Sequence, residues 1–360
     1  MSPASGLSKT ATRTLEAPPG ADATRQRGAL RPAARAVWLI AALVLLGLAV
    51  IASVAIGVRA TGWHDIVRGL TGDDSTIGSA AVHQRIPRTV LALIVGGALG
   101  LAGAVMQGVT RNPLADPAML GITTGASLWV VVGIAYLDLS APSSYIWVAI
   151  SGAAVSAAIV YAIGSLGRGG ATPLKLALAG AATAAAFSSL VSAILLPRVD
   201  VMDKFRFWQI GGVGGADWDR IRQVLPFLVL GGLVSLLSGR GLNSLALGDD
   251  VAAGLGEKVG RTRLLAGAGA IVLCGAATAV AGPIGFVGLV VPHICRLVVG
   301  VDHRWLLPAA VVLGALLLTW ADVLGRLIAR PAEVDVGIVT ALLGAPFFIW
   351  LVRRTRVRAL

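Results

Sequence analysis

The apolar residues of this chain occur in continuous runs of roughly 17–25 residues. A helix of that length spans the ~30 Å hydrocarbon core of a bilayer, whereas the apolar residues of a soluble core recur at helix or strand spacing. A membrane barrel would need alternating apolar and polar residues, and these runs do not alternate. The composition agrees, since 56% of the 360 residues are hydrophobic and only 13% are charged. We therefore predict an all-α integral membrane protein.

The runs predict about ten spans. They cover residues 37–59, 89–109, 119–137, 145–166, 174–196, 222–238, 264–281, 284–300, 305–328 and 337–352. The eighth run contains Pro292, His293 and Arg296, so we expect a short or broken helix there. Together the runs predict a transmembrane domain over residues 37–353.

Two polar tails flank this domain. Residues 1–36 lack an apolar pattern and predict a disordered tail, and residues 354–360 form a second tail. A secretory signal is the alternative at the N-terminus, but the run that follows is too long for one and no clear cleavage site follows it. With both tails in the cytoplasm, 19 of the 30 Lys and Arg residues fall inside and 11 outside, which favours that orientation. The net charge of +12 then reflects topology, and no nucleic-acid partner is expected.

The predicted inner loop over residues 239–263 carries a partial helical stripe. Leu242, Leu245, Leu247, Val251 and Leu255 are its apolar positions, and glycines interrupt it at 248 and 254. Two short amphipathic helices joined at a bend would fit, and so would an ordinary interfacial loop. The residues alone leave both open.

The predicted outer surface carries a polar stretch over residues 61–88, long enough for a short surface helix, and three arginines. Arg85 and Arg88 flank Pro87, which we expect to stiffen the entry to the second span, and Arg326 lies near the end of the ninth. Arginines at such positions can extend to lipid headgroups. They can also form forked bonds to the carboxylates of an external partner. Both interpretations remain open.

Catalytic chemistry has no visible residues here. The chain has no GxxxxGK[ST] loop, HExxH or GxSxG motif, so we expect no ATP hydrolysis and no catalytic site. His293, Cys295 and His303 favour structural roles, and no metal site is predicted. Asp322 stands out among very few carboxylates in the spans, which argues against an ion-coupled carrier. The small residues along the second span favour close helix packing.

Several segments in order resemble the FecCD-type permease family of bacterial ABC importers. They are Arg85-Ile86-Pro87-Arg88; Gly103 and Gln107 with Arg111-Asn112-Pro113-Leu114-Ala115-Asp116-Pro117 and Leu120-Gly121; Trp208 with Gly211-Gly212; Leu245-Ala246-Leu247-Gly248-Asp249; Gly285-Phe286-Val287-Gly288-Leu289-Val290-Val291-Pro292-His293 with Arg296; Asp302-His303-Arg304; Ala321-Asp322 with Arg326; and Gly337-Ile338-Val339-Thr340-Ala341-Leu342-Leu343-Gly344-Ala345-Pro346-Phe347-Phe348. Many family members carry a proline where this chain has Asp335. The change frees the backbone and places an acid near the expected docking surface.

The resemblance implies a type II ABC importer permease bundle in the bacterial inner (plasma) membrane, surrounded by membrane lipid. Its implied partners are a second permease subunit, identical or paralogous, two cytoplasmic ATPases that bind the ATP, and an extracytoplasmic substrate-binding protein. This chain would hold no cofactor. The implied cargo is a ferric siderophore, with haem and cobalamin as alternatives; an ion-coupled secondary transporter or a membrane scaffold would be a different class.

The resemblance also assigns roles to residues. Coupling to the ATPases is implied for helices within 242–258, at Leu245, Leu247, Gly248, Asp249, Ala252, Leu255 and Gly256. Docking of the binding protein is implied for Arg85, Arg88 and Arg326. Helix packing or gating is predicted for Gly96, Gly100, Gly103, Gln107, Asn112, Pro113 and Pro292.

Overall fold

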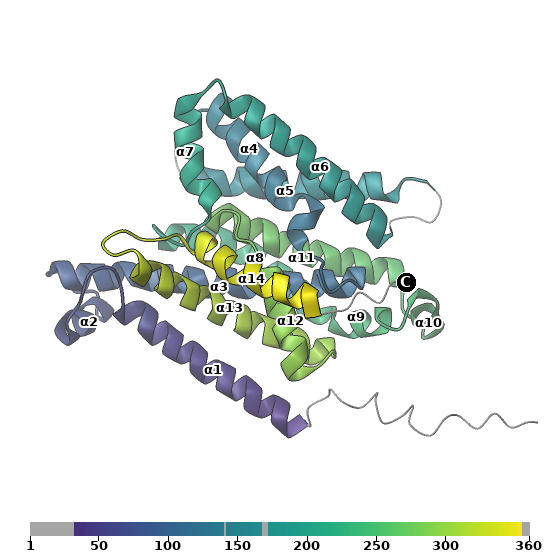
Figure 1. Cartoon of the computed structure of the whole chain (residues 1–360), viewed down its shortest axis with the longest axis horizontal. Helices are drawn as coiled ribbons and strands as arrows, with labels where there is room; N and C mark the ends of the chain where they lie inside the picture. The colour runs from purple at the N-terminus through teal and green to yellow at the C-terminus, as the bar shows by residue number, and fades with distance from the viewer. Residues whose placement is uncertain (1–31, 140–141, 168–171, 355–360) are drawn as a thin grey trace, which may run out of the picture.

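A computed structural model describes residues 32–139, 142–167 and 172–354, and it is built from helices with no strand among these residues (Figure 1). Most of the predicted N-terminal tail and of the C-terminal tail lie outside the described residues. The elements in chain order are α1 (Pro32–Ala55), α2 (Trp63–Leu70), α3 (Ile77–Thr110), η1 (Pro117–Leu120), α4 (Ile122–Tyr136), α5 (Pro142–Ser165), α6 (Pro173–Leu195), α7 (Val199–Ile210), α8 (Trp218–Leu237), α9 (Gly239–Leu245), α10 (Asp249–Gly254), α11 (Val259–Ala281), α12 (Val287–Val299), α13 (His303–Ile328) and α14 (Val336–Arg354).

The described residues contain seven helices that are long and apolar enough to cross a bilayer. They are α1, α3, α5, α6, α8, α11 and α13. Three shorter apolar helices, α4, α12 and α14, make up the remaining predicted spans. The structure therefore confirms a helical membrane protein with about ten spans.

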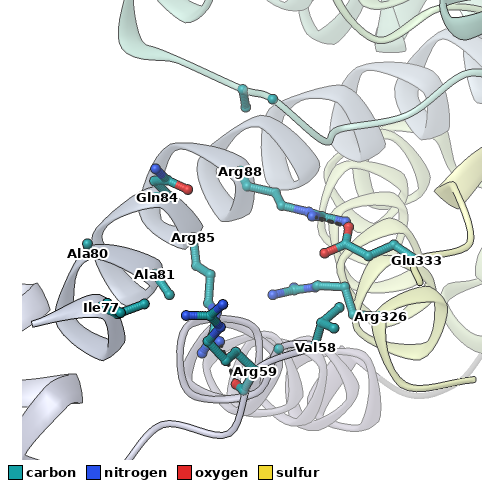
Figure 2. Close-up of a pocket in the computed structure, with 13 residues that line it drawn as sticks. Val58, Arg59, Ile77, Ala80, Ala81, Gln84, Arg85, Arg88, Arg326 and Glu333 are labelled. Carbon is teal, nitrogen blue, oxygen red and sulfur yellow. Dashed lines mark hydrogen bonds and ion pairs between the residues drawn. The ribbon is translucent and has the colours of Figure 1, made fainter. Parts of the chain in front are cut away.

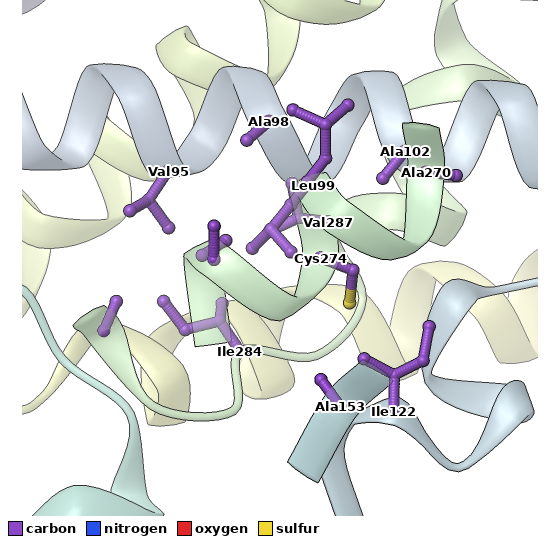
Figure 3. Close-up of a cluster of buried hydrophobic side chains, with 14 of the residues drawn as sticks. Val95, Ala98, Leu99, Ala102, Ile122, Ala153, Ala270, Cys274, Ile284 and Val287 are labelled. Carbon is purple, nitrogen blue, oxygen red and sulfur yellow. The ribbon is translucent and has the colours of Figure 1, made fainter. Parts of the chain in front are cut away.

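Helix α3 lies at the centre of the bundle, and its residues 95–109 are all buried. It contacts α13, α11, α12 and α1. Figure 3 shows part of the resulting core, where Val95, Leu99 and Ala102 of α3 face Cys274 of α11 and Val287 of α12. Because these side chains are small or aliphatic, the helices approach closely.

The glycines of α3 permit its tightest contacts. A Cβ atom at Gly96 would overlap the carbonyl oxygen of Gly314, and one at Gly100 would overlap that of Ala310. At Gly103 the overlap would be with the backbone of Gly288 in α12. The order of these contacts makes α3 and α13 antiparallel. Such backbone-to-backbone packing is what lets helices associate in lipid without a hydrophobic driving force.

The start of α3 differs from the prediction. The helix begins at Ile77, so Pro87 lies inside it and does not mark its entry. The Thr76 hydroxyl accepts a hydrogen bond from the Ser79 amide, which caps the helix well before the apolar run begins. Beyond the proline, the Thr89 hydroxyl donates to the Arg85 carbonyl one turn earlier in the same helix.

Other boundaries also moved. Helix α1 already begins at Pro32, inside the segment predicted as a tail, and ends at Ala55. Helix α2 is the short helix expected in the polar stretch. Helix α7 was not predicted, because its alternation of charged and apolar residues gives no long apolar run.

The bundle has two ends that differ in their short helices. The loop end carries α9 and α10, and the arginine end carries α2 (Figure 1). Arg85, Arg88 and Arg326 line one cavity at the arginine end, together with Val58 just after α1. The start of α1 lies toward the loop end in this view.

Candidate functional site

At the loop end, α9 and α10 are two short helices joined at a bend, as the stripe of apolar residues suggested. Gly248 forms the bend with a φ of +104°, a conformation that favours glycine. Asp249 and Asp250 then occupy the first turn of α10, where carboxylates interact favourably with the helix dipole. The sequence therefore encodes the bend itself.

The predicted stripe divides into two halves. Leu242 and Leu245 are fully buried against the bundle, whereas Leu247, Val251 and Leu255 are 60%, 52% and 67% exposed. The coupling loop, residues 239–258, thus has an anchored half and an apolar exposed half. Of the other predicted coupling residues, Ala252 is buried and Gly256 is exposed. Leu245 and Ala252 are buried and hold the loop against the rest of the chain, and the coupling role implied for this set stays a prediction.

Asp249 ties the coupling loop to two spans. One carboxylate oxygen lies 3.0 Å from Nη2 of Arg111, the residue that caps the end of α3, and 2.9 Å from Nη2 of Arg263 in α11. Sequence reasoning named Asp249 and Arg111 separately but did not pair them, and it missed Arg263, because partners in separate segments leave no local pattern. Any displacement of α10 would pull directly on α3 and α11.

A second set of bonds joins α9 to the start of α13. The Asn243 side chain donates to Asp302 at 2.6 Å and accepts from the His303 amide at 2.9 Å. Burial favours the protonated form of Asp302, but the hydrogen bonds from the Arg304 amide and Asn243, with the charges of Arg304 and Arg35, outweigh it and hold the pKa of Asp302 below its ordinary value. His303 therefore has a structural role here, with its ring Nδ1 2.9 Å from the Asn243 side-chain oxygen.

The remaining residues predicted for packing or gating lie toward the loop end of α3, just beyond it, and in α12. The Gln107 side chain donates to the Gly288 carbonyl at 3.2 Å and accepts a hydrogen bond from Arg296, so it bridges α3 to α12. Pro292 is buried within α12. Asn112 and Pro113 are exposed just beyond α3, where the Asn112 side chain accepts from the Leu114 amide at 3.0 Å and shapes the turn.

At the arginine end, two of the three predicted docking arginines fasten α1. The Arg85 guanidinium donates to the carbonyls of Val54, Ala55 and Arg59 at 2.9–3.2 Å. Arg326, only 1% exposed, donates to the Ser53 carbonyl at 2.8 Å and to the Ser53 hydroxyl at 2.7 Å. Carbonyls at the end of a helix have no partner within it, and these arginines supply one.

Arg88 and Asp322 complete a charged cluster. The Asp322 carboxylate lies 2.8 Å from Arg88 and 2.7 Å from Arg326, and Arg88 also pairs with Glu333 at 2.6 Å. Asp322 is thus the bridge between α3 and α13 and not a free intramembrane acid. The docking role that the resemblance implies for the arginines stays a prediction, and it requires a partner carboxylate to compete with bonds that the chain makes to itself.

A cavity of about 680 Å³ opens at the arginine end. Its charged lining consists of Arg59, Arg85, Arg88 and Arg326 against Glu333. Figure 2 shows these side chains gathered from α3, α13 and two loops. Arg59 is exposed and is the addition that sequence reasoning missed. With four guanidinium groups and one carboxylate, the cavity is suited to an anionic group.

Asp335, the departure from the family pattern, lines a second cavity of about 310 Å³ beside the first. Lys204 and Arg220 contribute to the same lining, and Gly212 packs directly over the carboxylate. Burial raises the pKa of Asp335, and the charges of Glu333 and Asp322 add to this against the opposing effect of Arg88. The acid therefore faces a cavity of its own.

Comparison with known proteins matches residues 44–354 to the FecCD transport family. The chain is 41% identical over 319 residues to the probable siderophore transport system permease protein YfiZ of Bacillus subtilis, covering 88% of this chain and 96% of that one. It is 43% identical over 321 residues to the ferric enterobactin transport system permease protein FepD of Escherichia coli, covering 89% and 96%. The hemin transport system permease protein HmuU of Yersinia pestis is 38% identical over 323 residues, covering 87% and 94%.

The fold also matches a solved structure, described as an inward-facing conformation of a proposed metal-chelate type ABC transporter. The TM-score is 0.78 at 28% identity, over 89% of this chain and 99% of that one. The likeness extends over nearly all the spans, and the family model covers both the coupling loop and the arginine end. On this evidence the chain belongs to the FecCD transport family and is a multi-pass permease subunit of the ABC transporter type.

Proposed function

We propose that this chain forms the membrane path of an ATP-driven importer for ferric siderophores. The cargo class rests on its relatives, several of which are described as siderophore, enterobactin, hydroxamate or citrate permeases. Haem is the alternative that one relative supports. A bulky chelate fits spans in which Asp322 is already neutralised by Arg88 and Arg326, since a bare iron ion would need free carboxylate or imidazole ligands.

The observation that carries the proposal is the exposed half of the coupling loop. Three exposed apolar side chains lie at the loop end of the bundle, on a segment that Asp249 joins to two spans; they are Leu247, Val251 and Leu255. A small apolar surface on a short helical segment that is fixed to the bundle is suited to bind in a cleft of another protein. Each of two cytoplasmic ATPases would receive this segment from one permease of a pair, and closure of the ATPases would move α3 and α11.

This assignment places the loop end and both chain termini on the cytoplasmic side of a bacterial inner membrane. The excess of Lys and Arg on that side supports it. The arginine end then faces outward, where the cavity with four arginines would receive carboxylates of a substrate-binding protein. Arg59 is the most accessible of the four for that contact.

The test is uptake of a radiolabelled ferric siderophore into vesicles that contain this chain, its second permease and the ATPases, with ATP inside the vesicles and the substrate-binding protein outside. Gly248→Arg should abolish uptake, because the positive φ and the new side chain disturb the bend. Gly167→Arg is the matched control: this glycine also has a positive φ, of +80°, no atom would contact its Cβ, and it lies outside the coupling loop. The control should transport normally.

Uptake by Gly248→Arg at the unmodified rate would contradict the assignment of the coupling loop. Uptake by this chain alone, driven by an ion gradient without nucleotide, would contradict the whole class and favour a secondary transporter.

A further inference from the structure

A groove of about 160 Å³ lies between α1, α12 and α13, in the half of the membrane near the loop end. Trp38 and Leu45 of α1, Cys295 and Val299 of α12, and Ala309 and Leu316 of α13 are among its lining residues. Since all three helices are spans, the groove opens on the hydrocarbon core. Trp38 and Leu45 remain about half exposed, so the opening is accessible from the side.

The two ends of α1 are held in different ways. At the arginine end, carbonyls from Ser53 to Gly57 accept hydrogen bonds from Arg85, Arg326 and Arg330. At the loop end, the space between α1 and its neighbours is the groove, and no hydrogen bond from α1 to α12 or α13 occurs there among the described residues. The protein leaves this part of the contact unfilled.

Arg35 lies at the loop end of the groove, one turn before Trp38 and Leu39 on the same face of α1. Its guanidinium approaches Gly300, the residue that ends α12, and its Nε atom is buried without a hydrogen-bond partner. The nearby carboxylate of Asp302 is held by Asn243 and the Arg304 amide and forms no ion pair with Arg35. The groove therefore ends at a guanidinium whose Nε–H has no acceptor, and the charge of Asp302 acts on it only from a distance.

We propose that this groove is a specific site for one anionic phospholipid. An acyl chain fills the apolar groove, and the phosphate binds the Arg35 guanidinium with the exposed Arg304 beside it. A guanidinium fork suits phosphate geometry, and tryptophan is enriched where the acyl chains meet the headgroups. The bound lipid would pack α1 against α12 and α13 at the end where protein contacts are missing. The proposal depends only on the spans and not on the transported cargo.

The experiment uses the purified full chain in phosphatidylcholine vesicles, with a small fraction of lipid brominated on its acyl chains. Bromine quenches tryptophan fluorescence on contact, and the difference between the unmodified chain and Trp38→Phe isolates the signal of Trp38. Brominated phosphatidylglycerol should reach half-maximal quenching at a mole fraction about fivefold lower than brominated phosphatidylcholine. That factor corresponds to the ~1 kcal/mol that one arginine gains at an anionic membrane surface.

Variants separate the headgroup from the acyl chain. Arg35→Gln should remove the preference for phosphatidylglycerol, and Arg261→Gln, which removes an exposed arginine at the same end outside the groove, should keep it. Ala309→Leu adds atoms to the groove wall and should reduce quenching by both lipids while Arg35 stays in place. This variant tests the groove even where Arg35→Gln does not fold.

Equal quenching by the two lipids would reduce the groove to ordinary surrounding lipid and overturn the proposal. Absence of quenching by either lipid would mean that another part of the chain occupies the groove, which overturns it as well.

Discussion

Asp322 is the residue whose loss should most disturb the arginine end. Its carboxylate neutralises Arg88 and Arg326, and the side chains of Asp322 and Arg326 are each only 2% exposed. In Asp322→Asn the shape is nearly unchanged but both arginines lose their anion. Arg88 keeps Glu333 and Arg326 keeps the carbonyls of α1, so the penalty falls mainly on charge pairing.

The magnitude follows from burial. Removing one partner of a buried ion pair costs about 3–5 kcal/mol. Because Arg326 still donates to the Ser53 and Ile56 carbonyls, we expect the lower value, about 3 kcal/mol. For a chain of this size that loss corresponds to roughly 5 °C in the unfolding midpoint. Thermal unfolding of the purified protein in one detergent, followed by the loss of the monodisperse chromatographic peak, measures it.

Two controls make the result decisive. Glu333→Gln breaks the exposed pair with Arg88 and should cost under about 1 kcal/mol, because the Glu333 side chain is 41% exposed. Asp322→Asn combined with Arg88→Met removes one of the two arginines that lost their anion and leaves the bonds from Arg326 to α1 intact, so it should recover part of the loss. A midpoint for Asp322→Asn within about 1 °C of the unmodified protein would refute the reasoning.

Three further predictions concern packing, coupling and pH. Gly100→Leu should abolish recovery of folded protein, since its side chain would overlap a backbone carbonyl of α13, whereas Gly232→Leu, with nothing within 4 Å of its Cβ position, should be recovered normally in the same chromatographic assay. Asp249→Asn should leave the unfolding midpoint nearly unchanged, because its ion pairs are partly exposed, but it should lower siderophore uptake per ATP hydrolysed. Asp250→Asn changes an exposed neighbour that lacks these pairs, and it should match the unmodified protein. Equal uptake per ATP in the two variants would contradict a role of Asp249 in linking α10 to α3 and α11. The pKa of Asp335 is raised in the folded state, so the protonated side chain favours folding, and this contribution is lost as the pH rises through the folded pKa. Asp335→Asn should therefore raise the unfolding midpoint at pH 7. The difference from the unmodified protein should vanish below the ordinary aspartate pKa of 3.8.

The spans and their approximate number were readable from the sequence, and a bend in the coupling loop was one of two interpretations that it left open. Runs of apolar residues long enough to cross a bilayer leave helices as the solution, because every backbone group must then be bonded within its own segment. Gly248 in the predicted stripe indicated the bend, since a positive φ selects glycine. These features are local, so local patterns carry them.

Helix ends and the division of the coupling loop were harder. The sequence placed the second span after Pro87, but the cap at Thr76 starts the helix earlier, and the proline lies inside it. A periodic stripe likewise could not show that Leu245 faces the bundle while Leu247 faces away. Which side of a short helix is buried depends on what packs against it.

The charged clusters were decided by tertiary structure alone. Arg85, Arg88, Arg326 and Asp322 were all visible as unusual charges, but the sequence could not distinguish a free docking fork from an arginine bonded to carbonyls of α1. Asp322 lies 234 residues from Arg88 along the chain, and they meet because α3 and α13 pack antiparallel through glycines. The long apolar runs of the sequence determined that this chain is a membrane protein. The pairing of charges that are distant in the sequence was decided only by tertiary structure, because it depends on how closely the helices approach one another.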